Sequence, residues 1–221
     1  MLGKRGVSSN GTINKGVLAG FSGKVGKVVG VSWKGISYMR SLPEKFEDPR
    51  TPAQLSHRSK FALTINFLKP LHTLLRTGWK LYTDRQTPMN AAVSYTFANA
   101  IAGTYPDYYI DPSKVLISRG GLTPAVNAKA AVESGAIHFM WEDNSGVNSA
   151  KQTDKALIAI VNIAKGETIS DSEGAERLTG TQTVALPADW VGDTVEAYLG
   201  FVSEDGSEVA NSVRLGSITV V

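Results

Sequence analysis

The sequence predicts an α+β fold: a glycine-rich N-terminal arm with a β-hairpin, then short helices, then a C-terminal immunoglobulin-like or fibronectin-like β-sandwich. Three observations support this. Nine glycines fall within residues 3–35, capped helical patterns occupy residues 48–112, and short strand-like runs fill residues 113–221. We therefore divide the chain into a glycine-rich basic arm and hairpin (1–47), a helical region (48–112) and an acidic sandwich domain (113–221).

The glycine-rich segment contains too much glycine for a helix. Its clearest part is a pair of β-prone runs, 27–33 and 36–41, on either side of Lys34-Gly35. This pattern predicts a hairpin with a two-residue turn. Trp33 and Tyr38 should then lie near the turn. Packing within a sheet is the preferred interpretation for these two aromatic residues, and a stacking platform for nucleic-acid bases is the alternative.

Helix signals begin after Asp48-Pro49-Arg50. Thr51 can cap a helix, Pro52 suits its first position and Gln54 completes a capping box. This helix should reach about Leu68, and further helices are expected near 71–82 and from Thr87-Pro88 onward. Apolar side chains at helical spacing should enter the core: Phe61, Ile65, Leu68, Leu71, Leu75, Trp79, Tyr82, Met89, Val93, Phe97 and Ile101.

Turn-forming residues are frequent between 103 and 112, and a β pattern begins at Ser113. Strands are then expected at 114–118, 136–141, 155–163, 175–178, 181–186, 194–202, 208–215 and 217–221. About seven short strands, with a tryptophan ending an early one, are typical of an immunoglobulin-like or fibronectin-like sandwich. Trp141 is interpreted as a core residue and Trp190 as a packed loop residue, in preference to ligand contacts.

Charge is distributed unevenly along the chain. Residues 1–120 contain 17 Lys/Arg and 6 Asp/Glu, a net charge of +11, whereas residues 121–221 contain 6 and 14, a net charge of −8. The basic half could meet nucleic acid, an acidic surface of another protein, or the acidic half of a neighbouring copy. A merely solvated basic face is the plain alternative. The candidate partner or self-association residues are Lys24, Lys27, Lys34, Arg40, Arg50, Arg58 and Lys60.

Motifs for catalysis and cofactor binding are not found. The chain has no cysteine, and His57, His72 and His138 lack the spacing of a metal site. The glycine-rich run 23–30 departs from the P-loop pattern, and Ser22 lacks the surroundings of a nucleophile elbow. We therefore expect a non-enzymatic protein with no cofactor, no metal and no small-molecule substrate.

Targeting and membrane signals are also not found. The sequence contains no apolar run of about 18 residues and no apolar stretch of signal-peptide type after its first residues. We expect no membrane span and synthesis in the cytoplasm, with later incorporation into a virion or other particle if the chain assembles.

Several segments carry a resemblance to a known family. The N-terminal ones are 16–26, 31–35 and 48–54, and the C-terminal ones are Trp141, Leu186-Pro187, 190–193 and 198–201. Together they resemble a Bacteroidota family known only as a domain of unknown function, over nearly the whole chain. The segment 49–54 is also similar to stretches of phage-derived virion proteins, which favours an assembly role.

These observations lead to two hypotheses. The first is a structural protein that forms homo-oligomers, virion-like or filament-like, through its basic N-terminal arm and its acidic sandwich. The alternative is a protein that binds or packages nucleic acid without sequence preference through the same basic residues.

Overall fold

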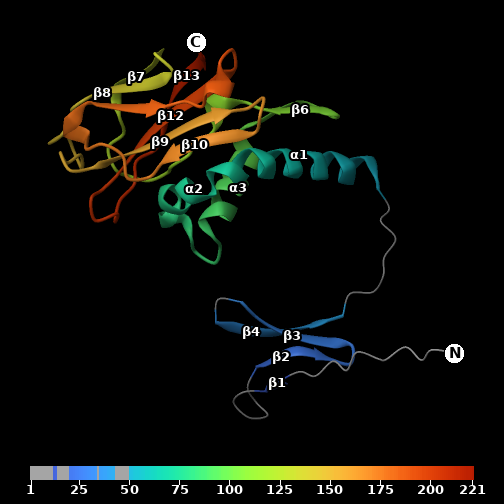
Figure 1. The fold of residues 1–221 in the computed structure, drawn as a ribbon. Coiled ribbons are helices and arrows are strands. Elements are labelled where there is room, and N and C mark those ends of the chain that lie inside the picture. The colour runs from blue at the N-terminus through green and yellow to red at the C-terminus, as the bar shows by residue number, and fades with distance from the viewer. Residues whose placement is uncertain (1–11, 14–19, 34, 43–49) are drawn as a thin grey trace. The chain divides into compact units, whose positions relative to one another are not determined.

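A computed structural model describes residues 12–13, 20–33, 35–42 and 50–221 of the chain. The chain divides into two compact units, Met1–Arg50 and Thr51–Val221, and each is described by itself (Figure 1). The expected combination of helices with several antiparallel sheets, most of them C-terminal, is confirmed.

The N-terminal unit contains a four-stranded antiparallel sheet in the order β1-β2-β3-β4. Its strands are Thr12–Ile13, Phe21–Val25, Val28–Trp33 and Ile36–Ser41. Trp33 pairs with Ile36, so only Lys34 and Gly35 connect β3 to β4, and the predicted two-residue hairpin is confirmed. Gly35 has a φ of +81°, a conformation that favours glycine in such a turn.

The second unit begins with helices α1 (Pro52–Leu68), α2 (His72–Gly78) and α3 (Pro88–Asn99), together with the 3₁₀ turns Lys69–Leu71 and Lys80–Tyr82. The predicted capping box is confirmed, because Thr51 Oγ1 accepts from the Gln54 amide while Gln54 Oε1 accepts from the Thr51 amide. Thr87 caps α3 through a single hydrogen bond, in which its Oγ1 accepts from the Asn90 amide. The helix starts are therefore those that the local sequence predicts.

A small hairpin follows the helices. Strands β5 (Ile101–Thr104) and β6 (Asp107–Ile110) pair antiparallel where the sequence predicted only a turn-rich stretch. The sequence prediction missed these strands because each has only four residues, too few to show a reliable alternation of apolar and polar residues.

Seven further strands form two antiparallel sheets. Their orders are β11-β8-β7 and β10-β9-β12-β13. The strands are β7 (Val126–Glu133), β8 (Ala136–Glu142), β9 (Lys155–Asn162), β10 (Glu167–Asp171), β11 (Thr181–Ala185), β12 (Thr194–Val202) and β13 (Val213–Thr219). A bulge between Ala197 and Tyr198 shifts the register of β12 against β13.

One hydrophobic cluster joins these two sheets face to face. Phe139 on β8, Ile158 on β9 and Leu199 on β12 are fully buried in it. Trp141 and Trp190 belong to the same cluster, with 6% and 1% of their surface exposed, so their prediction as packed residues is confirmed.

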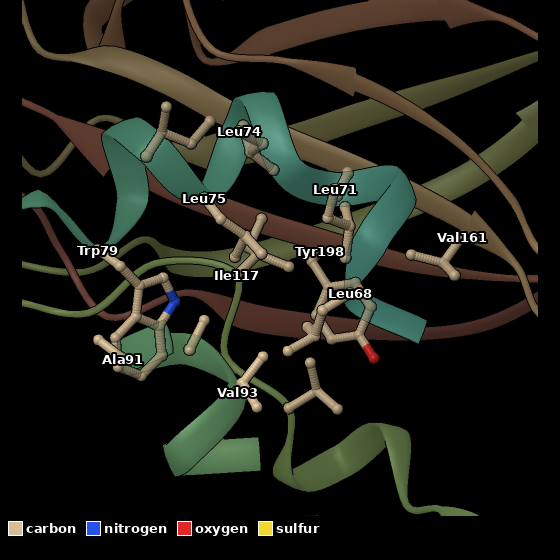
Figure 2. Packing of buried hydrophobic residues seen from close by; sticks show 14 of the residues in the cluster. Leu68, Leu71, Leu74, Leu75, Trp79, Ala91, Val93, Ile117, Val161 and Tyr198 are labelled. Carbon is tan, nitrogen blue, oxygen red and sulfur yellow. The ribbon is translucent and has the colours of Figure 1, made fainter. Parts of the chain in front are cut away.

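A second cluster covers the other face of the four-stranded sheet (Figure 2). Leu71, Leu75 and Trp79 from the helical region pack there with Val161 of β9 and Tyr198 of β12. Strands β9 and β12 are therefore buried on both faces, which explains why both read as continuous apolar runs rather than alternating ones. Residues 51–221 thus form three layers: helices, four-stranded sheet and three-stranded sheet.

Several predicted elements are wrong in detail. The segment 114–118 is not a strand, because Pro112–Lys114 forms a 3₁₀ turn and the Ile117 amide donates to the side chain of Ser212 instead of to a neighbouring strand. Residues 175–178 form a bridge and a 3₁₀ turn, and 217–219 are the end of β13 rather than a separate strand, while 220–221 follow it.

The predicted apolar stripes also fail at two positions, because Phe61 and Tyr82 are exposed. Phe61 remains 49% exposed, although Leu68, two turns further along α1, is fully buried. The N-terminal part of α1 extends past the cluster that its C-terminal part enters, so the same stripe changes from exposed to buried along one helix.

Candidate interaction surfaces

The seven candidate basic residues divide between the two units. Lys24, Lys27, Arg40 and Arg50 lie in the N-terminal unit and are exposed, and Lys34 of the same unit lies outside the described residues. Arg58 and Lys60 lie on α1 in the second unit. Four of the described candidates therefore belong to the N-terminal unit and two to the second unit.

Strand pairing brings two of these residues to the same face of the N-terminal sheet. Lys24 on β2 pairs with Val29 on β3, and Val29 in turn pairs with Arg40 on β4. Paired residues of adjacent strands point to the same side of a sheet. The two cations therefore flank Val29 on one face, a relation that hairpin prediction alone could not give because the pairing of β2 was not foreseen.

The same face carries exposed aromatic and apolar side chains near the hairpin turn. Trp33 is 51% exposed, Ile36 64% and Tyr38 47%. Alternation along β3 and β4 places them with Val29 and Arg40. We call this the aromatic face, defined by Lys24, Val29, Val31, Trp33, Ile36, Tyr38 and Arg40.

The opposite face is also apolar and accessible. Val25 and Met39 lie on it, 53% and 70% exposed. Among residues 20–33 and 35–42 of this unit, Gly30 alone is buried, and a Cβ there would lie 2.1 Å from the backbone oxygen of Phe21. Strands β2, β3 and β4 thus provide no hydrophobic side chain that is fully removed from water.

Lys60 takes part in a contact within the second unit. Its Nζ lies 4.7 Å from the ring centroid of Tyr108 on β6, a cation–π distance. The Tyr108 hydroxyl also lies 2.8 Å from Ser56 Oγ. These contacts fix the β5–β6 hairpin against α1, so Lys60 has a structural role whatever else it binds.

Acidic side chains of the second unit are held in their charged form. The Ser207 amide and the Ser203 and Ser207 hydroxyls donate to Asp205, and these hydrogen bonds hold the pKa of that carboxyl well below its usual value. Hydrogen bonds from Ser113 lower the pKa of Asp111 in the same way. The negative charge of these loops therefore persists under mildly acidic conditions.

A buried ion pair in the second unit was not foreseen from the sequence. Arg177 Nε lies 3.0 Å from Asp154 Oδ2, and both side chains are fully buried. Arg177 also donates to Asn144 Oδ1 and to the Thr123 carbonyl oxygen, at 2.6 and 2.9 Å. Burial lowers the pKa of the guanidinium while Asp154 raises it. The pair joins loops that are far apart in the chain, and no local pattern marks either residue.

The histidines occupy separate places. The His57 ring contacts the Phe97 ring at a tilt of 48°, with centroids 5.1 Å apart, and His138 Nδ1 lies 2.9 Å from Thr183 Oγ1. Within the described parts of the chain, no group of three or more His, Cys, Asp or Glu side chains could hold a metal ion. In the same parts, no helix is long and apolar enough to cross a membrane.

The sequence model of one protein family, a family of unknown function designated DUF6266, matches residues 20–216. The predicted membership of a family of unknown function is thereby confirmed, while the Bacteroidota assignment and the likeness to virion proteins stay predictions. No curated protein and no solved structure matches the chain.

Proposed function

The chain belongs to the DUF6266 family, and on that premise we propose that it is a non-enzymatic structural protein that self-associates through its N-terminal sheet. The sheet of one copy binds the acidic second unit of another. A contact between two different surfaces of this kind is heterologous and builds rings or filaments. The assembly that we propose is virion-like or filament-like.

One observation carries the proposal: the N-terminal sheet exposes apolar side chains on both of its faces. Trp33, Ile36 and Tyr38 lie on one face and Val25 and Met39 on the other, each close to half exposed or more. Isolated small sheets are marginally stable in water unless something covers a face. Exposed apolar surface rimmed by charged residues is typical of a protein interaction site.

Charge complementarity supports a second copy as the partner. Met1–Arg50 contains nine Lys/Arg and three Asp/Glu, a net charge of +6, whereas Thr51–Val221 contains 14 and 17, a net charge of −3. Opposite charges on the two units favour association between copies and oppose the pairing of like units.

The finer architecture that we propose for residues 113–221 is an immunoglobulin-like or fibronectin-like sandwich. The distribution of strands supports it: the first, second and fifth of the seven lie in one sheet and the remaining four in the other. Domains of this architecture are common as interaction modules, in agreement with an assembly role.

The experiment is the mass of the full chain in solution, measured by light scattering across a concentration series at low and high salt. We expect large species at low salt that dissociate as salt rises, because exposed charge pairs are screened. The double reversal Lys24→Glu and Arg40→Glu should abolish them. The matched control, Lys129→Glu with Lys151→Glu, changes net charge equally on exposed residues of the second unit and should leave them intact.

A monomer at every concentration and salt would refute self-association. The second candidate, binding of nucleic acid without sequence preference, is favoured by the position of Trp33 and Tyr38 beside Lys24 and Arg40, since bases stack on aromatic rings in basic grooves. It predicts species that contain nucleic acid by their absorbance at 260 nm and that dissociate on nuclease treatment. It leaves the apolar face with Val25 and Met39 unexplained.

A further inference from the structure

A cavity of about 250 Å³ lies in the second unit between α1, β6 and the strands β9 and β10. Leu63, Phe67, Ile110 and Val161 give it mainly apolar walls. Its volume is below the roughly 300–1,000 Å³ of typical small-molecule sites, so it suits one or two large side chains better than a whole ligand.

The edge of a sheet borders this cavity. Strand β10 is the first strand of the order β10-β9-β12-β13, and Thr168 on β10 lines the cavity. Thr168 Oγ1 is buried and has no hydrogen-bond partner among the described atoms. A buried hydroxyl without a partner is costly, and an edge strand presents unpaired backbone groups to an incoming strand. A strand that added to β10 would pair the free backbone groups of its edge. A side chain with a polar tip on that strand could enter the cavity and give Thr168 Oγ1 a hydrogen-bond partner.

Strand β4 of the N-terminal unit has the matching properties. It is also an edge strand, and all six of its residues are exposed. Its aromatic-face side chains are Ile36, Tyr38 and Arg40. A tyrosine combines an apolar ring with a hydroxyl, a combination that suits mainly apolar walls beside one unpartnered hydroxyl. Strand β10 carries two carboxylates and no cation, while β4 carries a cation and no carboxylate, so their charges are complementary.

We propose that β4 of one copy adds to the edge strand β10 of another copy and places Tyr38 in the cavity beside Thr168. This inference rests on the proposed self-association and names its receiving site. Main-chain hydrogen bonds between the two edges would provide affinity, and the cavity would provide specificity. Because each copy offers one donor strand and one acceptor edge, the contact propagates from copy to copy.

The test uses the full chain, which has no cysteine of its own. Ser41→Cys on β4 and Ser170→Cys on β10 are made in separate, differently tagged proteins, which are mixed with a bis-maleimide cross-linker. Its spacer must be long enough to reach around the sheet edge, because alternation places position 41 on the face opposite Tyr38 and position 170 on the face of Thr168. Both serines are exposed, so the substitutions should leave the fold intact. We expect an adduct between positions 41 and 170, identified by peptide mass. Thr219→Cys, exposed on β13 at the opposite edge of the same sheet, is the matched acceptor control and should give much less adduct.

Two further variants separate the faces of β4. Tyr38→Ser in the Ser41→Cys protein should lower the adduct yield at least about tenfold, the loss typical of a buried aromatic anchor at an interface. Met39→Ser, on the opposite face, should change it far less. Equal yields at 170 and 219, or no effect of Tyr38→Ser, would overturn the assigned receiving site. If light scattering still shows large species in that case, self-association survives, whereas a monomeric wild-type chain removes both proposals.

Discussion

Loss of the Arg177 side chain should strongly destabilise the second unit. Removing one partner of a buried ion pair leaves the other charge without compensation and typically costs about 3–5 kcal/mol. Asp154 is fully buried and its Oδ1 already has no hydrogen-bond partner among the described atoms, so Arg177→Ala leaves a carboxylate with little support. The hydrogen bonds to Asn144 and Thr123 are lost as well. We therefore expect a loss of about 4 kcal/mol, within that range.

The assay is urea unfolding followed by tryptophan fluorescence, because Trp141 donates to the Arg177 carbonyl oxygen and reports on this region. A loss of about 4 kcal/mol is a large part of the 5–15 kcal/mol that usually separates folded from unfolded states. The double variant Asp154→Leu with Arg177→Met removes both charges and should be much more stable than Arg177→Ala alone. A loss below about 1 kcal/mol for Arg177→Ala would refute the reasoning, since exposed ion pairs have that strength.

Three further predictions concern single positions. Burial raises the pKa of Tyr198 above its ordinary value of 10.0; the folded state therefore holds this proton more tightly than the unfolded state, and urea midpoints should fall as pH rises above 10, less so in Tyr198→Phe. Thr51→Ala removes a helix cap and should cost about 1 kcal/mol in urea unfolding, with Thr73→Ala, exposed within α2, as a control. Gly78→Ala should cost about 1–3 kcal/mol and lower the thermal midpoint, because its Cβ would lie 2.3 Å from the Ile117 oxygen.

Local signals in the sequence predicted the elements whose cause is local. The helix caps depend on residues three apart, and the hairpin turn depends on a glycine between its two strands, so Thr51, Thr87 and Gly35 could be assigned without tertiary information. The segment 114–118 has the composition of a strand, but Ser212 takes the hydrogen bonds that would have paired it. That competition arises between residues far apart in the chain, and strand propensity carries no information about such contacts.

The candidate interaction residues were likewise predicted only as far as local sequence allows. Charge counting correctly marked the N-terminal unit as basic, but only the register of three strands placed Lys24 and Arg40 on one face. Arg177 and Asp154 were missed because neither lies in a motif and their burial depends on loops that meet only in the folded unit. The exposure of Phe61 was missed because helical periodicity identifies a stripe without saying how far the core extends along it.

The N-terminal sheet and the second unit differ in how much apolar side-chain surface each buries. The second unit buries two large clusters on either side of one sheet, so its strands β9 and β12 need no further cover. The N-terminal sheet orders four strands, yet the large apolar side chains of β3 and β4 stay partly or largely in water, and fixing each residue costs about 1–2 kcal/mol of backbone entropy. Burial of Trp33, Ile36 and Tyr38 against a partner would offset part of that cost, since a large apolar side chain contributes about 1.5–3 kcal/mol when it is removed from water. Under the proposed self-association, the sheet should therefore gain stability when it binds its partner, and the monomeric chain should lose the N-terminal sheet more easily than the second unit.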